Sequence, residues 1–320
     1  MTEPVDSEIQ DAATILRRGG LVAFPTETVY GLGADAANPD AVAGIFAAKG
    51  RPADHPVIVH IARVEQLADW ATDIPPVAYA LAQQFWPGPL TLILKRHPQV
   101  SDAVTGGQDT IGLRIPGHPI ALALLAAFGG GIAAPSANRF GRISPTTAAH
   151  VREELGDTVD CILDGGPCQV GIESTILDLS AGHARVLRPG GISASALETV
   201  LGSALRAASG TTPRVPGALE SHYAPRTPLR LIRAEDLNAV VSAHLQQGER
   251  VAVLARSAVN PGHACTWQTM PASAEAYARE LYARLRALDA LQADYIVIEA
   301  PPAEPSWLAV ADRLQRAAWQ

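Results

Sequence analysis

Short apolar runs that end in polar loops and alternate with helix-like segments most constrain the fold of this chain. Residues 21–24 lead into Pro-Thr-Glu-Thr, and residues 132–134 lead into Pro-Ser-Ala-Asn. Asn38-Pro39 predicts the start of a helix over 40–49, because asparagine caps helices and proline suits their first turn. Alternating buried strands and helices predict an α/β fold, in which ligand sites gather where strands end.

The same pattern continues over the first 208 residues and predicts a mixed, twisted sheet with flanking helices. Strands are predicted at 21–24, 57–61, 90–94, 110–115, 132–134, 161–163, 175–179 and 185–187. Helices are predicted at 7–16, 40–49, 64–71, 76–85, 119–128, from 146, and at 194–207.

A chain of 320 residues exceeds what one core usually carries, so two domains are expected. Residues 209–228 hold four prolines and two glycines without apolar periodicity, which predicts a linker that is too polar to pack as core. Beyond it, strands at 229–232, 251–254 and 295–299 alternate with helices at 235–246, 274–288 and 307–318. This predicts domains at 1–208 and 229–320, the second a small doubly wound, Rossmann-like α/β domain.

Composition excludes several classes of protein. No apolar run approaches the roughly 20 residues of a membrane span, and the N-terminus lacks the pattern of a signal peptide. Three cysteines have no metal-type spacing, so no protein metal site is predicted, and the chain is read as cytoplasmic. A net charge of −7 with 5% aromatic residues argues against strong direct binding of nucleic acid.

Fixed cations stand at the ends of predicted elements. Lys49 and Arg51 lie two apart at a helix end, where both can reach one anion. Arg114 lies in an otherwise apolar strand and must find an anionic partner, either a ligand or a structural carboxylate such as Glu27 or Asp109. Arg188 repeats this situation in a later strand. Together these side chains predict a pocket for a polyanion.

Small polar side chains follow the strands that carry these cations. Ser136 and Asn138 come directly after residues 132–134, although a simple turn would use the same residues. Ser144 is either a ligand or the cap of the helix from 146. A histidine on a strand such as His60, taken alone, is more often a packed core residue than a ligand.

At this point the chain resembles the threonylcarbamoyl-AMP synthase family. The resemblance covers roughly residues 10–200. Its motifs are 25–32 (PTETVYGL), Lys49-x-Arg51, 86–91 (WPGPLT), 112–116 (GLRIP), 134–138 (APSAN), 172–176 (IESTI) and 187–190 (LRPG). The segment 221–225 (SHYAP) and the α/β domain after it resemble the longer, two-domain branch of the family, with its YrdC-like first domain.

The resemblance implies a nucleotidyltransferase that makes L-threonylcarbamoyl-AMP and pyrophosphate from L-threonine, bicarbonate and ATP. Mg²⁺ would accompany ATP, and the product would pass to the machinery that makes threonylcarbamoyladenosine in tRNA. The threonine amine captures carbon dioxide as a carbamate, whose oxygen attacks the α-phosphorus. No protein nucleophile is needed, so catalysis would be positioning plus electrostatic stabilisation.

The resemblance also implies site residues. The predicted threonine site comprises Thr28, His60, Arg114, Ala134 and Ser174. The predicted ATP site comprises Lys49, Arg51, His55, Thr110, Ser136, Asn138, Ser144, Arg188 and Tyr223, with Lys49 and Arg51 also acting in catalysis. Relatives often carry asparagine at the position of His55, whose ring could still donate to ATP.

Two other functions share parts of this pattern. One is the hydrogenase-maturation carbamoyltransferase, which the missing acylphosphatase-like and zinc-finger-like regions oppose, and the other is an RNA-binding module. For the linker, we expect residues 213–225 to fold over the first domain's cavity as a lid, with Tyr223 near the nucleotide. Truncation after about residue 208 should then leave a folded domain with poor turnover.

Overall fold

The computed structural model describes residues 6–205, 212–217 and 222–318, which form two compact units. The first comprises residues 1–140 and 144–218, and the second comprises 141–143 and 219–320. The predicted boundary at 208, the linker residues 209–211 and 218–221, and the end of the helix predicted to 207 lie outside the described residues. The three-part division at 208 and 228 therefore stays a prediction.

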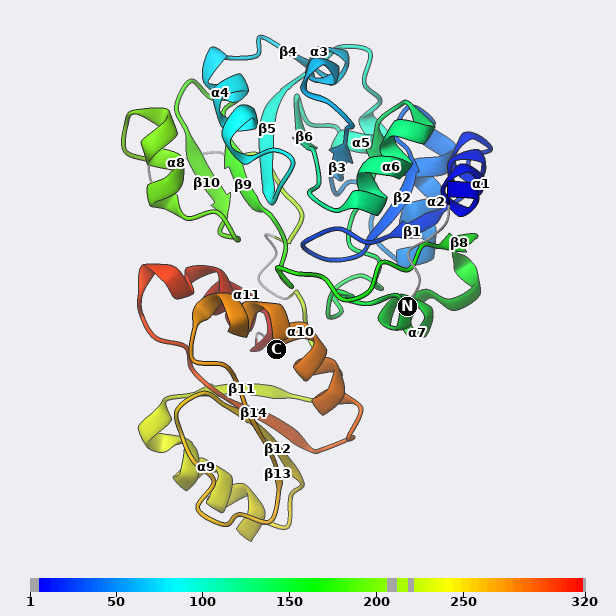
Figure 1. Ribbon diagram of the computed structural model, residues 1–320. Helices are drawn as coiled ribbons and strands as arrows, with labels where there is room; N and C mark the ends of the chain where they lie inside the picture. Colours follow the sequence, from blue (N-terminus) through cyan, green and yellow to red (C-terminus); the bar gives the residue numbers. More distant parts are fainter. Residues whose placement is uncertain (1–5, 206–211, 218–221, 319–320) are drawn as a thin grey trace. The chain divides into compact units, whose positions relative to one another are not determined.

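The first unit contains a mixed sheet, as predicted (Figure 1). Its strands lie in the order β10-β9-β5-β6-β3-β7-β2-β1-β8, with β4 paired to β5. The strands are β1 (Val22–Phe24), β2 (Gly31–Asp35), β3 (Ile58–His60), β4 (Ala71–Thr72), β5 (Leu90–Arg96), β6 (Thr110–Arg114), β7 (Ile132–Ala133), β8 (Cys161–Ile162), β9 (Thr175–Asp178) and β10 (Arg185–Arg188).

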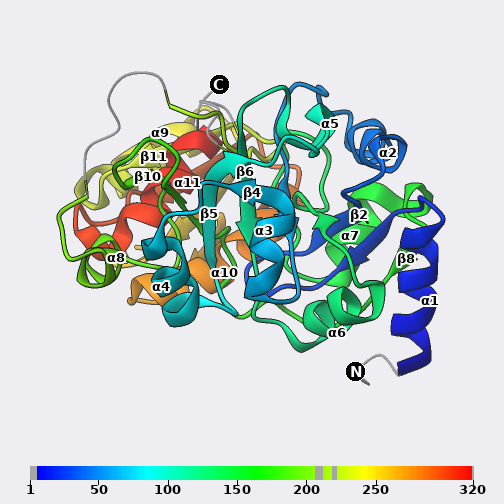
Figure 2. The ribbon, with the colours of Figure 1, turned by 90° about the horizontal axis from the view of Figure 1, so that it is seen from above.

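Helices cover both faces of this sheet. They are α1 (Asp6–Arg17), α2 (Pro39–Lys49), α3 (Leu67–Trp70), α4 (Pro76–Phe85), α5 (Asp102–Thr105), α6 (Pro119–Phe128), α7 (Ala148–Leu155) and α8 (Ala194–Leu201), with single 3₁₀ turns at Val64–Gln66 and Gly156–Thr158. Figures 1 and 2 show α1 and α6 side by side. Val22 and Phe24 pack in the same cluster as these two helices, whereas Ala23 belongs to the core of the opposite face, which includes α2 and α4.

The hairpin of β1 and β2 adds a strand at 31–35, where the sequence predicts only the loop that follows the strand at 21–24. β2 begins Gly-Leu-Gly and lacks the β-branched residues that mark strands. Gly33 is nonetheless required there, because a Cβ would come within 2.8 Å of the Phe24 ring and 2.9 Å of Ile132. Packing therefore selects a residue that sequence patterns associate with turns.

The second unit is the predicted doubly wound domain, with one strand more than expected. β11 (Leu229–Ile232), β14 (Tyr295–Glu299), β12 (Val251–Ala255) and β13 (Thr266–Thr269) pair in that order, all in parallel. The helix α9 (Ala234–Gln246) packs with the core of one face. The helices α10 (Ala274–Asp289) and α11 (Leu308–Ala318) contact each other and the strands β12 and β11, respectively, and a 3₁₀ turn spans Pro305–Trp307. Figure 1 shows α9 on one face of this sheet and α10 with α11 on the other.

The described linker residues 212–217 pack on the first unit. Val215 is buried in a cluster with Ile58, Ile93 and Ile176, so the expectation that this segment cannot pack as core is wrong at Val215. Arg214 donates from Nη2 to the Gly106 carbonyl (2.8 Å), and its backbone N–H donates to Oε1 of Gln108 (2.6 Å). The segment is thus tied to the sheet by apolar and polar contacts.

Candidate active site

The predicted threonine residues meet on one face of the sheet, where β3 and β6 run in parallel. His60 and Arg114 are the last residues of these strands and lie opposite each other in register. Their neighbours Val59 and Leu113 belong to the core of the other face, so the side chains of His60 and Arg114 project from the same face. Strand pairing thus joins two residues that lie 54 positions apart.

Arg114 is almost fully buried and held by three contacts. Its Nη2 donates to Oε1 of Glu27 (2.6 Å), its Nη1 to Oγ1 of Thr28 (3.0 Å) and its Nε to the Gly88 carbonyl (3.1 Å). The second carboxylate oxygen of Glu27 accepts from the Gly117 N–H (2.9 Å). The structural ion pair considered above is therefore present, with Glu27 as the partner; Asp109 lies beside Arg96 instead.

These contacts do not use all the N–H donors of the Arg114 guanidinium. Arginine carries five N–H donors, and the three contacts use one each, which leaves two N–H groups on the terminal nitrogens. Glu27 orients the guanidinium without using all of its donors, so the structural ion pair is present and ligand binding by Arg114 stays a prediction.

His60 is buried next to this guanidinium. Burial and the positive charge of Arg114 lower the pKa of His60 to about 3, so its ring is neutral at pH 7. Its Nδ1 is buried without a hydrogen-bond partner among the described residues, and its ring lies edge-on to Phe24 with centroids 6.1 Å apart. A buried nitrogen without a partner is costly unless a ligand satisfies it.

Ser174 and Arg188 form the far side of the same face. Ser174 Oγ lies 2.7 Å from Thr91 Oγ1 and 3.1 Å from Arg188 Nη2. Arg188 Nε donates to the Ser174 carbonyl (3.1 Å), and its Nη1 donates to the Pro216 carbonyl (2.8 Å). Arg188 therefore links a predicted threonine residue to the linker segment 212–217.

The cation pair lies where α2 ends. Gly50 terminates the helix in the left-handed conformation, with φ of 60°, and the chain then turns away. Lys49 is buried, and its Nζ donates to the carbonyls of Ser136 and Asn138. Burial, together with the charge of Arg51, holds the pKa of Lys49 well below its ordinary value.

Arg51 is oriented by its own loop. Its Nη2 donates to the Pro56 carbonyl (2.7 Å), and its guanidinium lies 5.8 Å from the centre of the Phe46 ring. His55 belongs to this loop, and its ring packs edge-on against Phe140 with centroids 5.4 Å apart. Burial and the charge of Arg51 lower the pKa of His55, which favours a neutral ring.

The loop after β7 carries the predicted amide and hydroxyls, and its Ser136 and Asn138 carbonyls contact Lys49. Ser136 pairs through its backbone with Gly31, and Asn138 Nδ2 donates to the Arg139 carbonyl (2.7 Å). Ser144 Oγ donates to Oε1 of Glu173 (2.6 Å). Helix α7 is capped by Thr147, whose Oγ1 accepts from the His150 N–H, so the reading of Ser144 as the cap is wrong.

The structure places the remaining predicted residues as follows. Ala134 donates from its N–H to the Ile58 carbonyl (2.9 Å) beside β3, and Thr110 begins β6 opposite Lys95. Tyr223 belongs to the second unit, where it is buried, stacks on Tyr282 and has Arg313 5.3 Å from its ring centre. Tyr223 is therefore not among the residues that the first unit itself brings together.

Sequence reasoning assigned no role to several polar residues of this face. Thr26 Oγ1 accepts from the N–H groups of Thr28 and Val29 and shapes the loop that carries Thr28. Thr91 supports Ser174, and Glu173 supports Ser144. Each of the three lies in or beside a motif quoted above and is buried. A buried hydroxyl in the otherwise apolar first part of β5 is the signal that could have identified Thr91, whereas Glu173 lies in the loop just before β9.

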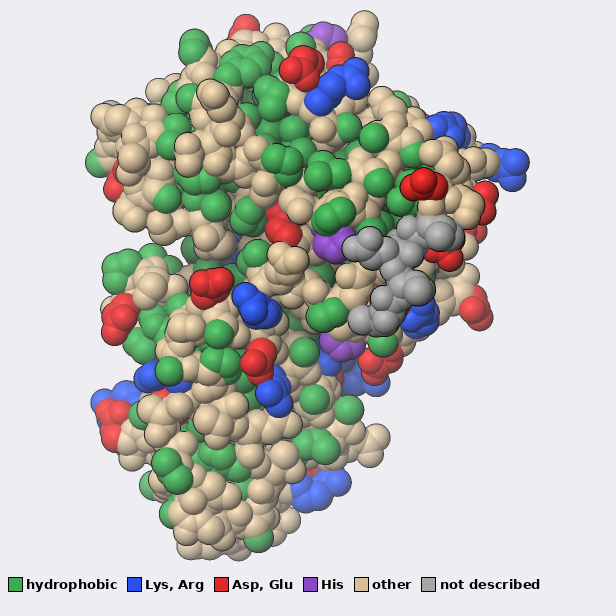
Figure 3. Space-filling view, viewed as in Figure 1, with side chains coloured by type: hydrophobic (Ala, Val, Ile, Leu, Met, Phe, Trp, Pro, Cys, Tyr) green, Lys and Arg blue, Asp and Glu red, His purple; other side chains and the backbone are tan. Residues whose placement is uncertain are grey.

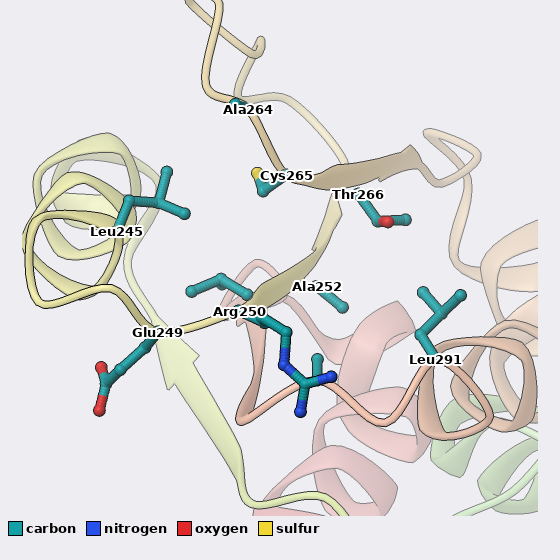
Figure 4. Close-up of a pocket in the computed structure, with 10 residues that line it drawn as sticks. Leu245, Glu249, Arg250, Ala252, Ala264, Cys265, Thr266 and Leu291 are labelled. Carbon is teal, nitrogen blue, oxygen red and sulfur yellow. The ribbon is translucent and has the colours of Figure 1, made fainter.

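A cavity of about 320 Å³ lies in the second unit (Figure 4). Its lining includes Glu249, Arg250, Cys265 and Thr266, at the amino ends of β12 and β13. Doubly wound domains bind ligands at the opposite, carboxyl edge. Arg250 is engaged with Asp294, and Glu249 with His244. The charged side chains that line this cavity are therefore already paired, and the polar face of the first unit is the better candidate for a ligand site.

Two searches of the described residues bear on metals and membranes. Within 6–205, 212–217 and 222–318, no group of three or more His, Cys, Asp or Glu could hold a metal ion. No helix in that part of the chain is long and apolar enough to span a membrane. On the face shown in Figure 3, basic and acidic side chains are interspersed.

The fold and this face define a two-domain α/β protein with buried cations and hydroxyls arranged for a polar, anionic ligand. Residues 14–190 match a family model described as "Telomere recombination", which groups Sua5, YciO and YrdC proteins. Residues 192–319 match the model described as "Threonylcarbamoyl-AMP synthase, C-terminal domain".

Relatives match over nearly the whole chain. Threonylcarbamoyl-AMP synthase of Pyrococcus abyssi is 40% identical over 97% of this chain and 94% of its own length, and that of Bacillus subtilis is 42% identical over 98% and 93%. The crystal structure of P. abyssi Sua5 complexed with L-threonine matches with a TM-score of 0.92 at 40% identity, covering 99% of this chain and 96% of that one. The chain belongs to the threonylcarbamoyl-AMP synthase family, in its two-domain form.

Proposed function

We propose that this protein is a nucleotidyltransferase that condenses L-threonine, bicarbonate and ATP to L-threonylcarbamoyl-AMP and pyrophosphate. The observation that carries the proposal is the pairing of His60 and Arg114 on one sheet face, with Thr28 bonded to Arg114 and Ser174 bonded to Arg188. The names of the relatives and the threonine complex of the P. abyssi protein support the same assignment.

The threonine site follows from the chemistry of these groups. The two remaining N–H groups of Arg114 suit a carboxylate, which guanidinium binds as a fork. The neutral ring of His60 offers a hydrogen bond without adding a second positive charge, and the hydroxyls of Thr28 and Ser174 offer further donors and acceptors. We place the threonine carboxylate at Arg114 and its hydroxyl and amine among these groups, over Ala134.

ATP would be held by the cations and by the loop after β7. Lys49 and Arg51 would neutralise phosphate oxygens, with Ser136, Asn138 and Ser144 donating to the phosphates or the sugar. Arg188 and Thr110 stand on the same sheet, and His55 would replace the asparagine of relatives by donating from a ring nitrogen.

In the reaction, bicarbonate takes up a proton and loses water to give carbon dioxide. The neutral threonine amine then bonds to its carbon and releases a proton, which leaves a carbamate. A carbamate oxygen then forms a bond to the α-phosphorus, and the bond from that phosphorus to the pyrophosphate oxygen breaks. Lys49 and Arg51 would stabilise the charge that develops on the leaving pyrophosphate. Positioning of the carbamate by Arg114 and Ser174 would supply the rest of the rate acceleration.

Mg²⁺ would enter with ATP, on the phosphate oxygens. Mg²⁺ keeps several waters and needs few protein ligands, so it fits a site whose described residues supply no acidic or histidine cluster. Glu173, beside Ser144, is the carboxylate suited to bind one of its waters.

The linker would act as a lid over this face. Val215 packs on Ile58, Ile93 and Ile176, and Pro216 accepts from Arg188, which supports a closed position. The role of Tyr223 near the nucleotide remains part of the proposal. We further propose that the enzyme works in the cytoplasm and passes its product to the machinery that modifies tRNA.

The test is pyrophosphate release by the purified protein. We expect release that requires ATP, L-threonine and bicarbonate together, with threonylcarbamoyl-AMP identified by mass spectrometry. Release without threonine, or turnover of carbamoyl phosphate instead, would reject the proposal in favour of the carbamoyltransferase reaction. RNA binding without any use of ATP would favour the binding module.

A further inference from the structure

The loop from Asn138 to Ser144 is divided between the two units. Asn138 and Ser144, its ends, belong to the first unit, whereas residues 141–143 belong to the second. Within the first unit, the Phe140 N–H donates to the Lys49 carbonyl (2.8 Å), and Ser144 is bound to Glu173. Both ends of the loop therefore contact the first unit beside the proposed ATP site, whereas its centre is held by the second unit.

The centre of the loop is held at the last turn of α10. Asp289 accepts from Nη2 of Arg142 (3.2 Å), and Arg286, one turn earlier on the same helix, donates to the Ile143 carbonyl. Asp289 also accepts from the backbone N–H of Thr227 (2.8 Å). One carboxylate thus joins the loop to the chain that follows the linker.

The backbone adds to these contacts. The Ala224 N–H donates to the Gly141 carbonyl (2.9 Å), and Arg142 and Ala224 form a parallel bridge. Gly141 has φ of 77°, where glycine is favoured. The centre of the loop is therefore paired through its backbone with Ala224, the residue after Tyr223.

Asp289 is poorly placed for helix stability. It is the last residue of α10, where a negative charge opposes the helix dipole, and its side chain is only 12% exposed. A buried carboxylate at the end of a helix lowers the stability of the fold unless its partners offset this effect. Its partners here are Arg142 and the backbone of Thr227, which points to a role in placing these segments.

We propose that Asp289 and Arg286 are positioning residues for the reaction. By fixing residues 141–143, they set the positions of Asn138 and Ser144, three residues away on one side and one on the other. The second domain would thereby act on ATP binding through the shape of one loop. This inference rests on the proposed function, in which Asn138 and Ser144 bind ATP.

The test compares Asp289→Asn with Asp294→Asn in the full chain. The amide introduced by Asp289→Asn would still accept from the Thr227 N–H but would lack the charge that pairs with Arg142. Asp294 is a matched control, because it also accepts from a backbone N–H and pairs with an arginine of the same domain, but does not contact the loop. We expect Asp289→Asn to raise the KM for ATP roughly tenfold and the KM for threonine less than about twofold, with a melting temperature like that of the control.

Arg142→Gln should reproduce this effect, and the double variant should be no worse than either single variant. Equal rises in both KM values, or kinetics that match the control, would overturn the inference. A loss of melting temperature without a selective change in the KM for ATP would do the same.

Hydrogen exchange of residues 139–144 gives a readout that does not depend on activity. We expect these amides to exchange at least about fivefold faster in Asp289→Asn than in Asp294→Asn. If the wild type released no pyrophosphate, the proposed function would fail while this comparison still decided whether Asp289 holds the loop. Equal exchange in the two variants would refute the positioning role even in an active enzyme.

Discussion

His60 and Arg114 occupy paired positions at the ends of two parallel strands, where burial, together with the charge of Arg114, keeps the ring of His60 neutral. Burial and the charge of Arg114 lower the pKa of His60 from its ordinary value of 6.5 to about 3. Between these two pH values, the unfolded chain binds a proton at His60 that the folded chain does not bind. Acid therefore favours unfolding through this residue.

We expect the free energy of unfolding of the first domain to fall between pH 6.5 and pH 4 more steeply in the wild type than in His60→Gln. The difference should approach about 1.4 kcal/mol per pH unit. Calorimetry at several pH values measures it, with His183→Gln as a control outside the site. Parallel pH profiles for wild type and His60→Gln would contradict a buried neutral histidine.

Lys49→Ala should reduce threonine-dependent pyrophosphate release by about a hundredfold or more, because it removes a buried cation from the proposed phosphate site. Arg51→Ala should act in the same direction. Lys95→Ala is the matched control, since Lys95 is the chain's other lysine and forms an exposed pair with Asp73. Lys49→Ala leaves two carbonyls without their donor, so a stability loss of about 1–2 kcal/mol is expected. Near wild-type turnover in Lys49→Ala and Arg51→Ala would reject the assignment.

Arg114→Lys keeps the charge but removes the planar fork. We expect it to raise the KM for threonine at least about tenfold while changing the KM for ATP little. It should also cost about 1–3 kcal/mol of stability, because the buried carboxylate of Glu27 loses its close partner. Initial rates at varied threonine and varied ATP separate the two effects. Equal changes in both KM values would show that Arg114 acts only through its ion pair with Glu27 and does not bind threonine.

The Arg214–Val215 bond should report on the lid. Arg214 is half-exposed, whereas Val215 is buried on the sheet, so cleavage by trypsin requires the segment to lift. We expect ATP and threonine together to slow this cleavage by about tenfold or more. Cleavage after Arg233, in the second domain, serves as the internal reference. If ATP and threonine left the rate of cleavage after Arg214 unchanged, the segment would only connect the two domains and would not act as a lid.

Glu299 should anchor the second domain. Its carboxylate is nearly fully buried at the end of β14 and accepts from the successive N–H groups of Arg256, Ser257 and Ala258. Burial alone would raise the pKa of Glu299, but these hydrogen bonds outweigh it, so the pKa lies below its ordinary 4.5. The resulting stability is present above about pH 4.5 and is lost as the pH falls through the lowered value.

Glu299→Gln should therefore cost about 2–3 kcal/mol at pH 7 and less in acid. The melting temperature of the second domain measures the change, with the exposed Glu304→Gln as its control. Equal melting temperatures for Glu299→Gln and Glu304→Gln at pH 7 would show that the carboxylate is dispensable.

How much the sequence could predict depended on the range of the interactions. Local signals predict α2, because Asn38 and Pro39 act within its first turn, and the short apolar runs predict the α/β alternation of both domains. The partner of Arg114 could not be chosen between Glu27 and Asp109, because the choice depends on a contact 87 positions away. The motifs supply the candidate ligands as a set that stays a prediction, whereas the register that places His60 beside Arg114 required the folded sheet.

The misses have physical causes as well. β2 was read as a loop because its glycines serve packing against Phe24, and β13 was missed because its residues Thr-Trp-Gln-Thr are short and partly exposed. The sequence predicts a linker too polar to pack as core around Val215, because a single apolar residue between prolines has no periodicity. In each case a tertiary neighbour decided the outcome.

The division of the loop at residues 141–143 also bears on the order in which the protein matures during synthesis. Arg142 and Asp289 lie 147 positions apart, and the ribosome delivers the N-terminal residue first. The first domain can therefore collapse around its sheet while residues 141–143 still await their partner. The loop reaches its final arrangement only after α10 has emerged, so a chain released early would carry most of the catalytic side chains without the support that aligns one of their loops.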